Sequence, residues 1–255
     1  MKAKAIAVVT ICAGLAFCAS SQAKGQRARE KDPQYQYNLG LFYLNQNDVD
    51  SATKYFVKAL SLDTKYYLAW NGLGLAHSMG GRLDESAKAY QKCLEVNPRF
   101  TEAHNNLGTV YQEMNQLDKA EGEFRTALAD LTYQNRELPY FNLARLYVLQ
   151  NRLDEALDNV QKAIQIKPRL AMAHNLEGLI YEKKNDLGEA ISAYEAAVKI
   201  VPEDVLFNYN LAVAYFKNED YARSKQAFLK IRGKVTDPAT KDAIARYLRL
   251  IGDRG

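Results

Sequence analysis

Three histidines, three cysteines and pairs of adjacent carboxylates such as Asp84-Glu85 are the side chains of this sequence whose types could do chemistry. A histidine can act as a general base or as a metal ligand. No two histidines have the His-x-x-x-His spacing that places both on one face of a helix, and no Cys-x-x-Cys metal spacing occurs. No glycine-rich phosphate-binding loop is present either. The sequence therefore predicts no metal centre and no cofactor.

The positions of these side chains indicate structural roles. His77, His104 and His174 fall at recurring positions of a repeat where other copies carry aromatic residues, so we expect them to pack rather than to catalyse. The pairs Asp84-Glu85 and Asp154-Glu155 recur at one turn, where negative charge favours the N-terminus of the next helix. We therefore predict that the protein is not an enzyme.

The repeat that positions these residues has a period of about 34 residues. Its most regular feature is a small residue, which returns at Gly40, Gly74, Gly108, Ala144, Gly178 and Ala212. A leucine usually precedes this small residue, an aromatic residue usually follows three positions later, and a second small residue usually follows twelve positions later. The period and the residue types resemble those of the tetratricopeptide helix-turn-helix unit.

The resemblance implies an all-α fold: a tetratricopeptide-repeat superhelix (an α-solenoid) of six helix-turn-helix units plus a C-terminal capping helix. Small residues let the two helices of a unit approach each other, and large residues fill the space beside them. One unit cannot bury its apolar face alone, so stacking must create a continuous core. The predicted units span residues 33–66, 67–100, 101–134, 137–170, 171–204 and 205–238, and residues 239–255 form the capping helix and tail.

The first helix of each unit is expected to line a concave groove. Asparagines recur there two positions before the small residue, at Asn38, Asn106, Asn142 and Asn210. Asparagine is a weak helix former, so its recurrence inside helices requires a reason. One hypothesis is a ladder of carboxamides that donate to and accept from the main chain of an extended peptide. The alternative is that these asparagines bond the neighbouring helix and hold the stack together.

A second groove position lies three residues before the small residue and mixes amide with aromatic side chains. It holds Tyr37, Asn71, Asn105, Phe141, Asn175 and Tyr209. With the asparagines above, these residues predict a surface for a protein or an extended peptide. Lys and Arg total 34, Asp and Glu total 30, and the two signs alternate along the chain. No segment offers the one-sided basic field of a nucleic-acid binder, so nucleic acid is not an expected partner.

The N-terminal residues 1–23 have the pattern of a signal peptide. Two lysines precede an apolar run that ends at Phe17 and is too short to span a bilayer comfortably. Cleavage after Ala23 would leave residues 24–32 as a polar linker. The four residues that end at Cys18 also resemble a lipobox, in which Cys18 would be acylated and would tether the protein to the outer membrane. Both alternatives predict export to the periplasm.

The order of these parts resembles the type IV pilus biogenesis lipoproteins of the PilF/PilW family, which have an export signal, a short charged linker and six tetratricopeptide units. The local match is Ala127 to Tyr133 (Ala-Leu-Ala-Asp-Leu-Thr-Tyr), followed by Asn142-Leu143-Ala144. The resemblance implies a periplasmic, outer-membrane-associated factor that helps the secretin pore of the pilus to assemble. The alternative is a general periplasmic adaptor for another envelope complex, such as polysaccharide export or cell-wall synthesis.

Overall fold

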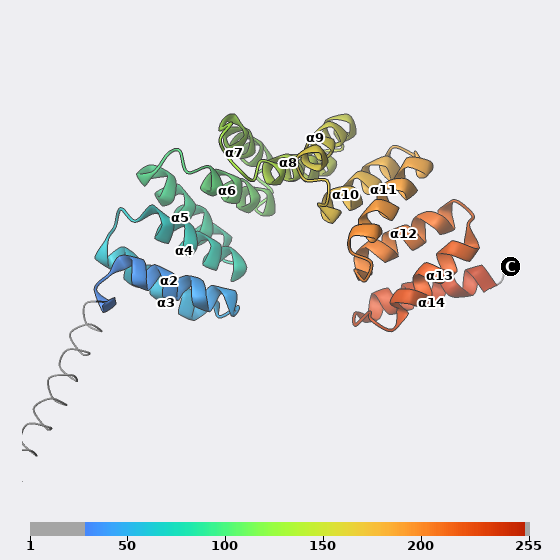
Figure 1. The fold of residues 1–255 in the computed structure, drawn as a ribbon, viewed down its shortest axis with the longest axis horizontal. Helices are drawn as coiled ribbons and strands as arrows, with labels where there is room; N and C mark the ends of the chain where they lie inside the picture. Colours follow the sequence, from blue (N-terminus) through green and yellow to red (C-terminus); the bar gives the residue numbers. More distant parts are fainter. Residues whose placement is uncertain (1–28, 253–255) are drawn as a thin grey trace, which may run out of the picture. The chain divides into compact units, whose positions relative to one another are not determined.

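The computed structural model describes residues 29–252, which form thirteen α-helices and no strand (Figure 1). The first helices of successive repeats are α2 (Pro33–Asn45), α4 (Tyr67–Met79), α6 (Thr101–Glu113), α8 (Glu137–Leu149), α10 (Ala171–Lys183) and α12 (Val205–Lys217). The second helices are α3 (Val49–Leu62), α5 (Leu83–Val96), α7 (Leu117–Ala129), α9 (Leu153–Ile166), α11 (Leu187–Ile200) and α13 (Tyr221–Arg232), and α14 (Pro238–Gly252) follows them. The all-α fold of six helix-turn-helix units with a final helix is therefore confirmed.

Some of the predictions concern residues outside the described part of the chain. These are the signal peptide at residues 1–23, the lipidation of Cys18 and the linker before Arg29. Within residues 29–252, no helix combines the length and the apolar composition that are needed to cross a bilayer.

The helices divide into two compact bodies. The N-terminal body ends at Gln116 and contains α2 to α6, whereas the C-terminal body begins at Leu117 and contains α7 to α14. In the N-terminal body α2 packs on α3 and α4 on α5, and α3 and α5 each contact the helix that follows. In the C-terminal body the pairs α8/α9, α10/α11 and α12/α13 follow one another, and α14 packs on α13. Each body is therefore a stack of helix pairs.

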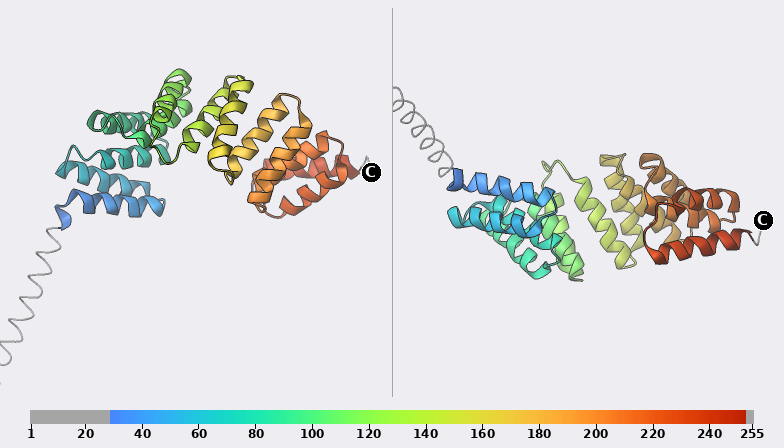
Figure 2. Two further views of the ribbon diagram at one scale, coloured as in Figure 1. Left: turned by 45° about the horizontal axis from the view of Figure 1, so that its top comes forward. Right: turned by 90° about the horizontal axis from the view of Figure 1, so that it is seen from below.

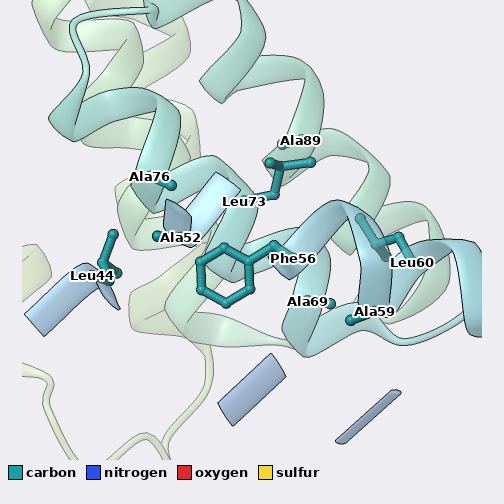
Figure 3. Close-up of a cluster of buried hydrophobic side chains, with 9 residues drawn as sticks. All are labelled: Leu44, Ala52, Phe56, Ala59, Leu60, Ala69, Leu73, Ala76 and Ala89. Carbon is teal, nitrogen blue, oxygen red and sulfur yellow. The ribbon is translucent and has the colours of Figure 1, made fainter. Parts of the chain in front are cut away.

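The side chain of Phe56 occupies the centre of a buried cluster in the N-terminal body (Figure 3). Phe56 on α3 is 0% exposed. A Cβ atom on Gly40 would lie 2.5 Å from Cε1 of Phe56, and a Cβ atom on Gly72 would lie 2.6 Å from the same atom. Because no side chain can approach that closely, both positions require glycine. Gly72 stands at the position where four other repeats carry the predicted asparagine and the fifth repeat carries Leu176.

The C-terminal body repeats this close packing and adds α14. A Cβ atom on Gly178 would lie 2.6 Å from Cδ1 of Tyr194, which is itself buried. At the end of the stack, Ile244 of α14 joins one buried cluster with Phe228 and Ile231 of α13. The final helix thus covers apolar side chains of the sixth repeat.

The turn between the two helices of each repeat holds one residue in the left-handed backbone region. It lies seven positions after the small residue of the repeat and has a φ of 58° to 70°, at Asn47, Gly81, Asn115, Asn151, Asn185 and Glu219. Glycine and asparagine adopt this region most easily, because a larger side chain crowds the following carbonyl oxygen. Glu219, with a φ of 60°, is the exception.

Replacing Glu219 by asparagine is expected to raise the free energy of unfolding by up to about 1 kcal/mol. The Glu219 side chain is exposed, so the exchange removes strain without loss of packing. Urea denaturation followed by circular dichroism measures the difference. The reverse exchange, Asn185→Glu, is the matched control and should lower stability by a similar amount. Unchanged stability in both variants would contradict the assignment of strain to this position.

Candidate functional site

Two of the three histidines contact a backbone carbonyl at the end of the preceding repeat. Nε2 of His104 lies 3.1 Å from the carbonyl oxygen of Pro98, and Nε2 of His174 lies 3.0 Å from that of Pro168. Three further repeats place a side-chain N–H donor at the same position, bonded at 2.8–2.9 Å to the carbonyl oxygen six residues earlier, in Gln36, Trp70 and Asn208. Since this bond ties the first helix of a repeat to the turn before it, these two histidines have a structural role.

Neither metal binding nor thiol chemistry has a site in the described part of the chain. Among residues 29–252, no group of three or more His, Cys, Asp or Glu side chains is placed to hold a metal ion. Cys93 is buried, and burial raises its pKa to about 12. The thiol therefore stays protonated at neutral pH and is a poor nucleophile.

The third histidine, His77, is held as a neutral acceptor. Its Nδ1 atom accepts a hydrogen bond from Nε of Arg82 at 3.0 Å. Burial, and then the positive charge of Arg82, lower the pKa of His77. Below about pH 6.5, His77 of the unfolded chain therefore binds a proton more readily than His77 of the native state. The free energy of unfolding must consequently decrease as the pH falls through this range.

We expect the free energy of unfolding to decrease between about pH 7 and about pH 5, in part because of His77. The variant His77→Tyr restores the residue that the other five repeats carry at this position, and it cannot take up this proton. Its stability should consequently decrease less over the same range. Urea denaturation of both proteins at three pH values measures the two slopes, and equal slopes would contradict a depressed pKa at His77.

The predicted asparagine positions are connected to each other between neighbouring repeats. Nδ2 of Asn106 on α6 donates to Oδ1 of Asn71 on α4 at 3.3 Å. Nδ2 of Asn210 on α12 donates to Oδ1 of Asn175 on α10 at 2.8 Å. These bonds favour the hypothesis that the asparagines hold the stack together. Each carboxamide can make further hydrogen bonds, so contact with a peptide is compatible with the same geometry.

Asn38 and Asn142 complete the predicted asparagine series. Asn38 is exposed, and its Oδ1 atom accepts a hydrogen bond from Nε2 of Gln34 at 3.1 Å. Asn142 is half-buried on α8. Both side chains therefore retain some surface that a partner can reach.

The second predicted groove position is more buried than a ligand surface requires. Asn71 is 8% exposed, Asn105 is 6% exposed and Phe141 is 9% exposed. The half-buried rings of Tyr37 and Tyr209 pack against core phenylalanines of the second helix, with centroids 5.8 Å and 5.9 Å away respectively. These five side chains mainly support the repeat stack and offer a partner little area. Asn175 is half-buried.

A third position on the first helices, which sequence reasoning did not select, carries an exposed apolar side chain in every repeat whose first helix lies in the C-terminal body. It lies six residues before the small residue and holds Leu138, Met172 and Leu206, which are 37%, 55% and 57% exposed. In the N-terminal body the same position holds Gln34, Leu68 and Glu102. Because two of the six residues at this position are polar, it stands out less in the sequence than the small-residue position does.

Known families and structures match this chain throughout the repeat region. Tetratricopeptide-repeat family models match residues 33–66, 67–100 and 89–122, and the model of the tetratricopeptide repeat protein 21 C-terminal ARM domain matches residues 107–231. No curated protein matches the sequence.

Three solved structures resemble the chain closely in fold. PilF of Pseudomonas aeruginosa has 16% identity and a TM-score of 0.75, over 86% of this chain and 99% of that chain. PilW, described as a widely conserved type IV pilus biogenesis factor, has 18% identity and a TM-score of 0.74, over 84% of this chain and 98% of that one. The Cut9–Hcn1 hetero-tetramer of the APC/C has 18% identity and a TM-score of 0.75, over 86% of this chain, which spans only 43% of that one. At these identities the likeness shows the fold alone.

Proposed function

We propose that this chain is a non-catalytic assembly factor of the bacterial envelope that serves the secretin of a type IV pilus. The chain is a tetratricopeptide-repeat protein, and this fold is a scaffold for protein–protein interaction. The observation that carries the proposal is the likeness in fold to PilF and PilW, which extends over nearly the whole length of both proteins. The local match at residues 127–133 and the order of the parts along the chain support it.

The proposed location is the periplasm. Its support is the signal-peptide pattern of residues 1–23, with Cys18 as the site of a lipid anchor if the lipobox is used. Labelling cells with a radioactive fatty acid tests the anchor in the natural protein and in the variant Cys18→Ala. A label that depends on Cys18 would establish the lipoprotein, and the absence of label in both would leave cleavage after Ala23.

Deletion of the gene in its own host tests the pilus role. We expect secretin multimers to disappear from a gel run without boiling and twitching motility to be lost, because an unassembled secretin leaves no pore for the pilus. Both should return when the gene is restored. Normal multimers with normal motility would refute the pilus role and would leave an adaptor for polysaccharide export or cell-wall synthesis.

A further inference from the structure

Three exposed apolar side chains form a row across neighbouring helices of the C-terminal body. We call Leu138 on α8, Met172 on α10 and Leu206 on α12 the apolar row. The three residues occupy the same position of successive repeats, and α10 contacts both α8 and α12. The successive helix pairs of this body are visible in Figure 2. The row therefore lies along one side of the stack.

The exposure of the apolar row requires an explanation. Each member is between 37% and 57% exposed, whereas Leu143, Leu146 and Ile180 on the same helices are 0–3% exposed. An aligned group of exposed apolar residues on a soluble protein marks an interaction site more often than isolated residues do. Burying one such leucine or methionine fully is worth about 1.5–3 kcal/mol.

Cations accompany the apolar row on the same helix faces. Arg145 lies seven residues after Leu138, and Lys183 and Lys217 lie eleven residues after the other two members of the row, spacings that keep one helix face. We call these three the basic group. Arg145 and Lys183 form no ion pair within the described residues, and Lys217 pairs with Glu182.

The N-terminal body carries no positive charge at the equivalent positions. Its helix α6 carries Glu102 and Glu113 there, and neither α2 nor α4 contains a lysine or arginine. The difference in charge makes the C-terminal body the part of the chain that suits an acidic partner.

We propose that the apolar row and the basic group together dock one polypeptide segment that carries aliphatic side chains beside aspartate or glutamate. The inference rests on the proposed scaffold function and names the chemistry of its partner. The bonded pair Asn210–Asn175 lies on the same helices and retains hydrogen-bonding capacity for a main chain. This mixture of apolar, cationic and amide groups suits a peptide, whereas a membrane surface has no main-chain amide to recognise.

The test selects peptides without assuming a natural partner. A phage-displayed library of random 12-residue peptides is panned on the whole purified chain, and the binding of the selected peptides is measured by fluorescence anisotropy. We expect selected sequences to combine aliphatic and acidic residues and to bind more weakly as the salt concentration rises. Selected peptides that lack this combination, or no selection at all, would overturn the proposal.

Three variants locate the binding surface. The double variant Met172→Asp and Leu206→Asp should bind the selected peptides at least about tenfold more weakly. The variant Lys183→Glu should also bind them more weakly, and its affinity should depend less on the salt concentration. The control Leu229→Asp changes a residue of α13 that is 50% exposed and should leave affinity unchanged. Circular dichroism melts verify that all variants fold.

Two results would overturn the proposal without touching the scaffold function. The first is full affinity of the double variant for the selected peptides. The second is binding of phosphatidylglycerol vesicles that the double variant abolishes while peptide binding persists, which would assign the surface to a membrane. Conversely, normal twitching in the deletion strain would refute only the pilus role, because peptide selection involves no pilus.

Discussion

Replacing Phe56 by alanine is expected to lower the free energy of unfolding by about 3–5 kcal/mol. Phe56 is 0% exposed and lies in van der Waals contact with Gly40 of its own repeat and Gly72 of the next one. The surrounding helices cannot close the resulting cavity, because backbone atoms form two of its walls. The variant therefore loses both the apolar transfer energy and the contacts that join two repeats.

Urea denaturation of Phe56→Ala and of Phe42→Ala measures this effect against a matched control. Phe42 is also a phenylalanine of the first repeat, but it is 54% exposed. Its replacement should change stability by no more than about 0.5 kcal/mol. Similar losses in the two variants would contradict the central position of Phe56 in the N-terminal body.

Replacing Ile244 by alanine is expected to cost about 2–5 kcal/mol. Ile244 is 1% exposed and, with Ile251, is one of two buried residues by which α14 enters the cluster of Phe228 and Ile231. The ring of Tyr247, also on α14, stacks on that of Phe228 with centroids 5.0 Å apart. Loss of Ile244 should loosen α14 and expose apolar residues of the last repeat.

Amide hydrogen exchange reports this loosening together with the thermal melt. In Ile244→Ala we expect faster exchange in α13 and α14 and unchanged exchange in the N-terminal body. The control is Leu250→Ala, since Leu250 lies on the same helix but is 38% exposed. Exchange in α13 that does not respond to Ile244→Ala would show that α14 does not protect the end of the stack.

The sequence predicts the helices and their pairing well, because close packing of two backbones restricts residue size. Gly40 and Gly178 recur in register for this reason, since each touches a buried aromatic ring of the following helix. The left-handed turn position was detectable too, because it is asparagine or glycine in five of six repeats. A search for small and apolar residues alone does not find it.

The binding surface was harder to predict, since its properties are not residue types at fixed positions. One repeat position is defined by a side-chain N–H group that lies against the carbonyl oxygen six residues earlier, at His104, Trp70 and Gln36. A search for aromatic residues cannot detect this shared hydrogen bond. The asparagines recur as predicted, but the side chains of Asn106 and Asn210 each donate a hydrogen bond to an asparagine of the neighbouring repeat. The position of Met172 is polar at Gln34 and Glu102 and apolar elsewhere, and only the exposed area identifies its apolar members as a surface.

The central claim is that this chain holds another polypeptide on the first helices of its repeats. Hydrogen–deuterium exchange of the whole chain, alone and with the purified secretin subunit of its host, tests this claim most directly. We predict slower amide exchange in α8, α10 and α12 when the secretin is added. The exchange rates in the second helices α9, α11 and α13 should change less. Identical exchange with and without the secretin, or protection confined to the second helices, would contradict it.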